Sequence, residues 1–413
     1  MEKVISLILA VMVVSISYAQ AINGTWKGML NAGNQKLEIV FHFNYQKDGN
    51  STAEMDVPAQ GALGIPVNLK FLSTDSVSLE VMALLMAYTG KLTDGTIKGT
   101  FNQFGMPFPL DLKSGEAAIS NRPQEPKLPL GYNTEEVTFT NQDAGVSLSG
   151  TLTYPVDYTS GKKVPVVIML TGSGAQNRNE EVFGHKPFLV MADYLAKQGI
   201  ASLRYDDRGV GKSAGSQVGC TSVDFAADAE NGLSWLKNTG KFSRIGVLGH
   251  SEGGMIAFML GAEGKADFIV SMAGPGIKGD TLLAEQQNAI LKLKGFPPTV
   301  TVKALRKSMA AQSSNVWLEY FMNYDPQINL SKITVPVMAV NGSNDVQVLP
   351  DSNLGAIRKY LSGKNKKNLI KEYSGLNHLF QHCNLSTAMD YYKIEETCSL
   401  EVLQDIADWI KSL

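Results

Sequence analysis

The chain has 413 residues, with 37 Lys and Arg against 39 Asp and Glu, which gives a formal net charge of −2. This length allows two or three domains with ample hydrophobic core. A content of 44% hydrophobic and 18% charged residues excludes a disordered chain. The near-neutral charge balance argues against a nucleic-acid-binding protein, which needs a concentrated basic surface. Three cysteines are too few for a disulfide scaffold.

The N-terminal residues have the pattern of a secretory signal. Glu2 and Lys3 precede an apolar run at residues 4–16, and small residues follow as far as Ala19. This run is shorter than the roughly 20 residues that span a bilayer. We therefore expect a signal peptide at residues 1–19, cleaved after Ala19, rather than a retained membrane anchor. The mature chain would be secreted or periplasmic, with no stable membrane anchor.

Residues 20–120 are expected to form a small all-β domain. Apolar and polar residues alternate at 37–43 and at 77–81, and Asp94-Gly95 marks a turn. Short strands without a long helical repeat favour an antiparallel barrel or sandwich. Its core should contain the aromatic side chains of Trp26, Phe41, Phe43, Phe71 and Phe101. The sequence identifies no partner for this domain.

A proline-rich segment at residues 121–134 comes next. Pro123, Pro126 and Pro129 fall at three-residue intervals among polar residues, which favours a stiff, extended linker. We expect few contacts across this linker, so that the domain after it folds by itself.

Residues 135–413 alternate between strands and helices, which indicates an α/β sheet. Strands are expected at 137–140, 146–154, 164–170, 201–205, 245–248, 266–272, 335–340 and 368–373, and helices at 186–198, 222–238, 255–262 and 400–410. Residues 276–330 interrupt this alternation, and we interpret them as an inserted helical cap. Leu291, Trp317 and Phe321 of the cap are expected to form the roof of a substrate pocket.

The most informative motif is Gly249-His250-Ser251-Glu252-Gly253-Gly254, which follows a buried strand and opens a helical stretch. A serine on such a sharp strand-to-helix turn is exposed at the carboxyl end of the sheet. The helix N-terminus then lies beneath any developing negative charge. We predict Ser251 as a catalytic nucleophile.

A serine hydroxyl needs a base to take its proton. In a parallel sheet of this kind the base follows the acid in the chain, and both lie in loops after later strands. Of the five histidines only His378 and His382 come late enough, and His378 directly follows the strand at 368–373. We predict His378 as the base and expect His382 to point elsewhere.

The predicted acid is Asp345, in the loop after the strand at 335–340. Asp325 and Asp351 are rivals, but neither lies where a strand would deliver it to the site. Two backbone N–H groups should form an oxyanion hole. One belongs to Glu252, after the nucleophile, and the other to Ser173, in the glycine-containing loop after the strand at 164–170.

Two glycine motifs do not meet the requirements of a nucleotide site. Asn177 occupies the third glycine position of the dinucleotide pattern that begins at Gly172, and Asp206 occupies the first glycine position of a phosphate-binding loop ending at Ser213. His378 and His382 beside Cys383 lack a third metal ligand at a recognisable spacing. We therefore expect neither a cofactor nor a metal.

Cys383 and Cys398 could close a loop of about 15 residues with a disulfide. They could equally remain two small buried thiols. The spacing of the two cysteines leaves both possibilities open.

Several motifs together resemble the α/β-hydrolase superfamily, in particular the secreted bacterial carboxylesterases related to serine aminopeptidases and monoglyceride lipases. The motifs occupy residues 171–180, 206–213, 249–254, 342–345 and 375–378, and the resemblance covers about residues 135–413. It implies a catalytic triad of Ser251, Asp345 and His378. One departure is Thr171, where many relatives have His. The resemblance also implies a structural role for Asp206 and Arg208.

The leading functional hypothesis is hydrolysis of a small-molecule carboxylic ester through an acyl-enzyme. The alternative is a serine aminopeptidase with the same triad, which would need a carboxylate pair for the substrate ammonium, with Glu180, Glu181 and Glu252 as candidates. A different class is a binding protein with an inert hydrolase fold. We expect short or medium acyl chains, because Lys and Arg residues interrupt the apolar residues of the cap.

Overall fold

The computed structural model of the chain describes residues 22–32, 35–46, 51–58, 62–81, 86–103, 105–115, 121–310 and 315–413. The predicted signal peptide at residues 1–19 lies outside these residues. The chain divides into two compact units, residues 1–119 and 120–413. Among the described residues, none of the helices combines the length and the apolar character needed to cross a membrane.

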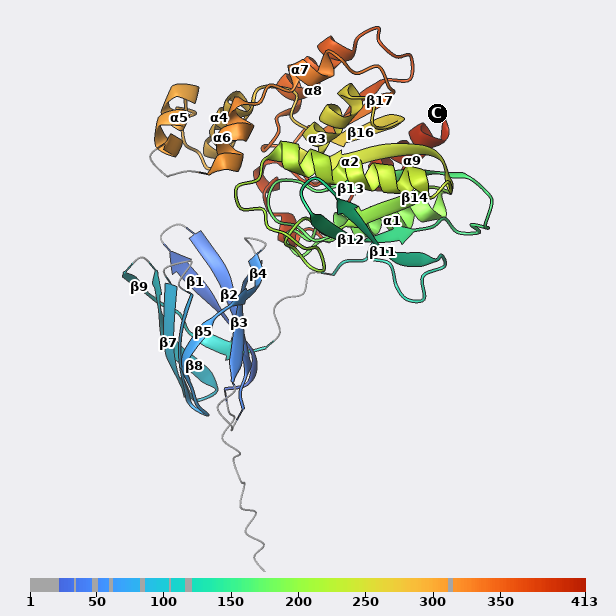
Figure 1. The fold of residues 1–413 in the computed structure, drawn as a ribbon. Helices are drawn as coiled ribbons and strands as arrows, with labels where there is room; N and C mark the ends of the chain where they lie inside the picture. The colour runs from blue at the N-terminus through green and yellow to red at the C-terminus, as the bar shows by residue number, and fades with distance from the viewer. Residues whose placement is uncertain are drawn as a thin grey trace, which may run out of the picture. The chain divides into compact units, whose positions relative to one another are not determined.

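The first unit is an antiparallel sheet, as the alternating patterns predicted (Figure 1). Its strands are β1 (Gly24–Ala32), β2 (Gln35–Asn44), β3 (Thr52–Val57), β4 (Ala62–Pro66), β5 (Asn68–Leu72), β6 (Ser76–Val81), β7 (Met86–Thr93), β8 (Thr96–Gln103), β9 (Met106–Pro109) and β10 (Leu112–Ser114). They pair in the order β4-β3-β2-β1-β10-β8-β7-β6-β5, and β9 pairs with β8. Trp26, Phe41, Phe43 and Phe101 lie in its core, at most 3% exposed.

Phe71 is not part of this core, and the prediction that placed it there is wrong. Its side chain is 55% exposed. The pairing of β5 with β6 shifts register between Leu69 and Phe71. Because side chains alternate between the two faces of a strand, an irregularity of one residue transfers Phe71 to the outer face.

The second unit has an eight-stranded sheet between two layers of helices (Figure 1). Its strands are β11 (Thr134–Asn141), β12 (Val146–Thr153), β13 (Val164–Leu170), β14 (Ala201–Tyr205), β15 (Phe242–His250), β16 (Phe268–Met272), β17 (Val337–Gly342) and β18 (Leu369–Tyr373), in the order β11-β12-β14-β13-β15-β16-β17-β18. The strands from β14 to β18 in this order are parallel, whereas β11 and β12 are antiparallel additions. The fold class predicted from the sequence is confirmed.

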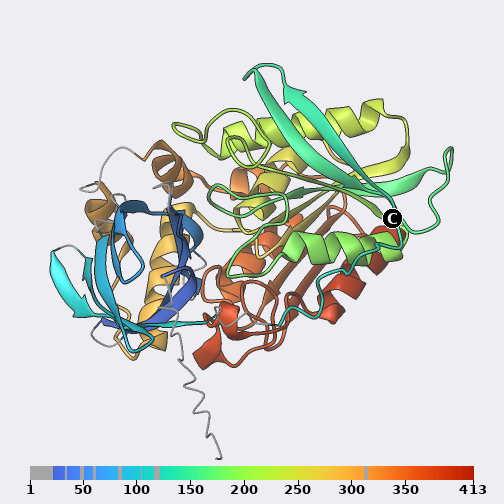
Figure 2. The ribbon, with the colours of Figure 1, turned by 90° about the horizontal axis from the view of Figure 1, so that it is seen from below.

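Helices cover both faces of this sheet. α1 (Pro187–Lys197) and α9 (Leu400–Lys411) lie on one face, and α2 (Ser222–Asn238), α3 (Glu252–Ala262) and α8 (Pro350–Leu361) lie on the other (Figure 2). Strand β13 contributes alternate residues to the two cores, with Val166 and Ile168 in one and Val167 and Met169 in the other. A strand that is buried on both faces needs an uninterrupted apolar sequence, which explains the run at Val164–Leu170.

Two predicted strands begin later than expected. Strands β16 and β17 start at Phe268 and Val337, two residues inside the predicted ranges. Pro336 lies just before β17, has no N–H to donate, and only accepts a hydrogen bond from Ile269 N. The strand therefore begins after this proline.

The cap interrupts the sheet between β16 and β17, as predicted. It contains α4 (Gly279–Leu293), α5 (Val302–Ala310), α6 (Val316–Asn323) and α7 (Gln327–Leu330). Leu282 and Phe321 from two of these helices form a small apolar cluster with Met255 of α3 and Val348. This cluster attaches the cap to the carboxyl end of the sheet.

The proline-rich segment is bound to the second unit instead of being a free linker. The guanidinium of Arg122 donates hydrogen bonds to the carbonyl oxygens of Gly184, Tyr392 and Ile394, at 2.9, 2.9 and 2.7 Å. Gln124 accepts a hydrogen bond from Thr397 N at 2.6 Å. Hydrogen bonds between these polar side chains and the backbone of the second unit therefore fix this segment in place.

All three cysteines are free thiols, which resolves the open question about Cys383 and Cys398. Cys398 is buried, and burial raises the pKa of its thiol. Cys383 is half-buried beside Asn344, whose amide donates to its carbonyl oxygen at 2.9 Å.

Candidate active site

Ser251 lies on the turn between β15 and α3, where the motif placed it. Its φ is 53°, in the left-handed region that residues with side chains rarely adopt. A Cβ on Gly249 would lie 2.0 Å from the carbonyl oxygen of Gly253, and a Cβ on Gly253 would lie 2.1 Å from that of Leu170. The turn therefore requires glycine at both positions. It presents the serine at the N-terminus of α3.

Asp345 and His378 meet at the ends of the neighbouring strands β17 and β18. His378 Nδ1 lies 2.7 Å from Asp345 Oδ2, and the two side chains are 5% and 0% exposed. The other carboxylate oxygen, Oδ1, accepts hydrogen bonds from the backbone N–H groups of Gln347 and Val348, at 2.7 and 2.9 Å. The acid is thus held by its own loop while it binds the imidazole.

The rival residues lie elsewhere. His382 is exposed, and its Nδ1 lies 2.8 Å from Glu396 Oε2. Asp351 is in the first turn of α8, and Asp325 accepts a hydrogen bond from the backbone N–H of Gln327, the first residue of α7. None of these three predicted alternatives lines the cavity that contains the serine.

The two predicted oxyanion donors both lie near Ser251. Ser173 follows β13 in a loop that passes close to Ser251, because a Cβ on Gly172 would lie 3.2 Å from Ser251 Cβ. Glu252 is the first residue of α3, where N–H groups have no partner within the helix. Both positions can direct a backbone N–H toward an oxygen bound at the serine.

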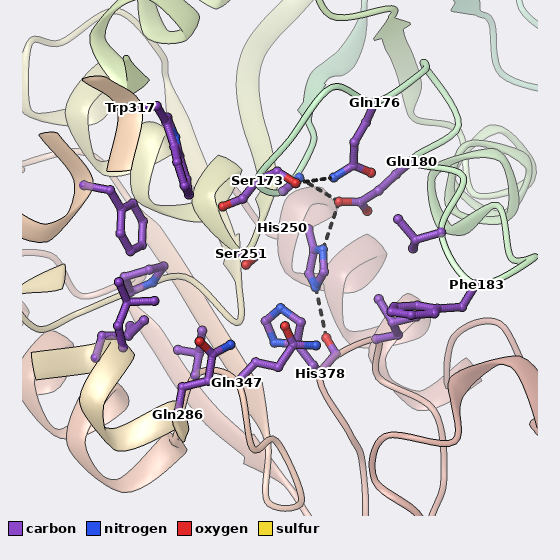
Figure 3. A pocket seen from close by; sticks show the side chains of 18 residues that line it. Ser173, Gln176, Glu180, Phe183, His250, Ser251, Gln286, Trp317, Gln347 and His378 are labelled. Carbon is purple, nitrogen blue, oxygen red and sulfur yellow. Dashed lines mark hydrogen bonds and ion pairs between the residues drawn. The ribbon is translucent and has the colours of Figure 1, made fainter. Parts of the chain in front are cut away.

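A cavity of about 360 Å³ opens in front of Ser251 and His378 (Figure 3). It is lined by Gly172, Ser173, Gln176, Glu180, Val182, Phe183, His250, Ser251, Pro275, Leu282, Leu283, Gln286, Trp317, Phe321, Gln347, Val348, His378 and Leu379. The rings of Trp317 and Phe321 stack with centroids 5.4 Å apart and form one apolar wall. The amides of Gln286 and Gln347 add polar groups to the cavity.

The expectation that Leu291 helps to form the roof is wrong, because it does not line this cavity. Leu283, on the same helix α4, takes that place. Leu291 lies about 12 Å further along the helix axis, at a rise of about 1.5 Å per residue.

The side chain of Glu252 connects the cap to the nucleophile turn. Its Oε1 accepts hydrogen bonds from Ser222 Oγ at 2.5 Å and from Trp317 Nε1 at 2.8 Å. The carboxylate is 2% exposed. Trp317 therefore contributes to the wall of the cavity and also attaches α6 to the residue after the nucleophile.

The sequence predicts no role for His250, and it makes Glu180 a candidate only as a ligand of a substrate ammonium. In the structure His250 Nδ1 lies 2.9 Å from Glu180 Oε1, and both residues are buried (Figure 3). The signal that could have found His250 is a titratable residue at the end of the apolar and glycine stretch 245–249 of β15. Its partner is 70 residues away in the chain, so no local pattern pairs them.

The segment at residues 206–213 is held by ion pairs. Arg208 Nη2 lies 2.7 Å from Asp228 Oδ1, and Asp206 Oδ2 lies 2.7 Å from Arg178 Nη2. Neither Asp206 nor Arg208 lines the cavity. These ion pairs give Asp206 and Arg208 a structural role, because they hold the segment in place.

Comparisons with known proteins found similarity to hydrolases and esterases. A family model described as serine aminopeptidase, S33, matches residues 187–339, a span that contains Ser251 but ends before Asp345. Esterase EstD of Thermotoga maritima is 26% identical over 285 residues, which are 66% of this chain and 68% of that protein. The esterase Pf2001 of Pyrococcus furiosus has a TM-score of 0.48 at 19% identity, covering 72% of this chain and 99% of its own.

The topology and the order of the site residues are diagnostic together. A serine on a strand-to-helix turn is followed in the chain by an aspartate and then a histidine, each after a later parallel strand. This order and this turn define the nucleophile elbow of α/β hydrolases. The family model covers the strand, the turn and the helix that carry the serine. The chain therefore has the α/β-hydrolase fold, with Ser251, Asp345 and His378 in the chain order typical of that superfamily.

Proposed function

We propose that this protein hydrolyses carboxylic esters with short or medium acyl chains through an acyl-enzyme. The observation that carries the proposal is the 2.7 Å bond between His378 and Asp345 in a cavity that also contains Ser251. The name of the relative EstD, an esterase, supports the same reaction class.

In the proposed mechanism Ser251 Oγ attacks the ester carbonyl and His378 Nε2 takes its proton. Asp345 keeps the imidazole in the tautomer whose Nε2 is free and stabilises the cation that forms. The backbone N–H groups of Ser173 and Glu252 receive the developing oxyanion. His378 then protonates the departing alcohol, and a water molecule activated by the same imidazole releases the acid and restores the serine.

The cavity supports a small substrate. Its volume of about 360 Å³ is near the lower end of the range for small-molecule sites. The apolar wall of Leu283, Trp317 and Phe321 suits an acyl chain, and each methylene that fits gains about 0.8 kcal/mol. Methylenes beyond the wall gain nothing, so activity should pass through a maximum with acyl length.

The contacts of three carboxylates favour an ester over a peptide substrate. An aminopeptidase needs a carboxylate pair for the substrate ammonium, but Glu180 binds Gly172 N and His250, and Glu252 binds Trp317. The carboxylate of Glu181 accepts a hydrogen bond from Asn177 at 3.2 Å. These bonds leave no two free carboxylates among the three candidates.

The test is a hydrolysis series with p-nitrophenyl esters of two to sixteen carbons and with aminoacyl p-nitroanilides, using Ser251→Ala as the control. We expect ester rates that rise and then fall with acyl length, negligible anilide rates, and loss of both in the variant. Rates that increase up to the longest chain, or faster anilide than ester hydrolysis, would contradict the proposal.

We also propose that the enzyme acts outside the cytoplasm, on the basis of the signal peptide expected at residues 1–19. N-terminal sequencing of the protein recovered from a Gram-negative periplasm should begin at Gln20. Recovery of the full-length chain from the cytoplasm alone would contradict this.

A further inference from the structure

A buried ion pair lies beside Ser251, and both of its residues line the same cavity. The side chains of His250 and Glu180 are 8% and 2% exposed, and His250 Nδ1 is 2.9 Å from Glu180 Oε1. The mechanism above uses neither side chain. Burying a charged pair costs desolvation energy, so such a pair is weak evidence for a stabilising role. Its place beside a catalytic serine suggests instead that it positions neighbouring groups.

Each member of the pair holds a different catalytic loop. Glu180 Oε1 also accepts a hydrogen bond from Gly172 N at 2.8 Å, in the loop that contains the oxyanion donor. His250 Nε2 lies 2.9 Å from the backbone carbonyl oxygen of His378. One continuous chain of hydrogen bonds therefore runs from the oxyanion loop to the backbone of the catalytic base, and it passes beside Ser251 (Figure 3).

Both neighbours of the imidazole are acceptors. A carboxylate oxygen and a carbonyl oxygen can be satisfied together only if both ring nitrogens of His250 carry hydrogen, which makes the ring a cation. Burial acts to lower the pKa of His250, but the Glu180 carboxylate, the His378 carbonyl and the Asp345 charge together outweigh it, and the net shift is upward. The negative charge of Glu180 thus maintains both hydrogen bonds of the imidazole.

We propose that Glu180 and His250 are positioning residues that hold the oxyanion loop and the base loop in register with the nucleophile. This inference rests on the proposed esterase function. The pair acts through Gly172 and through the backbone of His378. Its loss should therefore lower kcat and leave KM nearly unchanged, because the misplaced groups act on the transition state rather than on bound ester.

The backbone around Glu180 supports this role. Glu180 has a φ of 52°, and Phe183, three residues later, has a φ of 51°. Residues with side chains adopt this region only when the surrounding structure requires it. The strained turn places the Glu180 carboxylate at the hydrogen-bond distance from Gly172 and from the imidazole.

The experiment compares conservative and truncating variants at each position. Glu180→Ala and His250→Ala remove the connection, and kcat should fall 10²- to 10³-fold, the usual effect of losing an oxyanion donor, with KM changed less than threefold. Glu180→Gln keeps an acceptor for Gly172 N, and His250→Gln keeps a donor for the His378 carbonyl. Each of these two variants should have a kcat at least tenfold higher than the alanine variant at the same position.

A matched control is Asp228→Asn, which breaks the equally buried Arg208–Asp228 pair away from the cavity. It should lower the melting temperature but change kcat less than twofold. The proposal is overturned if Glu180→Ala and His250→Ala keep wild-type kcat while only their stability falls, or if they raise KM with unchanged kcat. Ser251→Ala separates the hypotheses, because ester turnover that survives it would contradict the proposed function itself.

Discussion

Replacing Asp345 with asparagine should inactivate the enzyme by fixing the wrong tautomer of His378. Asp345 Oδ1 accepts two backbone N–H groups, from Gln347 and Val348, at 2.7 and 2.9 Å. In the Asp345→Asn variant the amide oxygen must take this position, because an NH₂ group would face two donors. The amide NH₂ then takes the place of Oδ2 and donates to His378 Nδ1.

An imidazole that accepts at Nδ1 carries its hydrogen on Nε2 and cannot take the proton of Ser251. Because the loop that carries this side chain keeps both backbone hydrogen bonds, the variant should fold normally. We expect kcat to fall about 10⁴-fold, the known scale of this tautomer effect in serine hydrolases. At about 1.36 kcal/mol per factor of ten, this is roughly 5 kcal/mol of lost transition-state stabilisation.

The assay is kcat and KM for p-nitrophenyl butyrate at pH 8, with circular dichroism and the melting temperature as folding controls. Asp351→Asn is the matched control, because Asp351 lies in the first turn of α8, does not line the cavity, and should keep kcat within twofold. A folded Asp345→Asn enzyme that keeps more than a tenth of wild-type kcat would refute the reasoning, as would a larger loss in the Asp351→Asn variant.

Three further predictions concern the cap, the N-terminal segment of the second unit and acid stability. Trp317→Phe keeps an aromatic wall but removes the hydrogen bond to Glu252, so kcat/KM should fall about tenfold and amide hydrogen exchange of α6 should accelerate. Unchanged exchange rates would contradict the attachment of α6 through this hydrogen bond. Arg122→Ala should lower the melting temperature by roughly 4–8 °C, because about 2 kcal/mol of hydrogen bonding is lost. A chain starting at Lys127 should have a melting temperature lower by at least the same amount than a chain starting at Ser120. Equal melting temperatures of these two chains would contradict a stabilising role for the segment. Burial lowers the pKa of His185 to about 4, below its unfolded value of about 6.5. The unfolded state therefore binds more protons in this range, and the free energy of unfolding should fall as the pH drops from about 6.5 to about 4. In the His185→Gln variant the denaturant midpoint should depend less steeply on pH in that window, and an unaltered pH dependence would contradict the assignment.

The sequence by itself determined the class of the fold and the location of the chemistry. Apolar runs, glycine positions and strand-to-helix alternation are local signals, and they were sufficient to place Ser251 on its turn. Asp345 and His378 could be selected because parallel strands deliver the loops that follow them to one edge of the sheet. The structure brings these two side chains to 2.7 Å.

Only the tertiary structure decided which polar groups that are distant in the chain form hydrogen bonds with one another. Glu180 and His250 are 70 residues apart, and Arg122 and Ile394 are 272 residues apart, so their hydrogen bonds leave no periodic trace in the chain. The bulge that exposes Phe71 depends on the register of two strands rather than on the composition of either. Hydrophobic patterning determines which face of an element is buried, because burial follows local periodicity. The pairing of polar groups depends on loop paths and helix positions, which are fixed only when the whole domain packs.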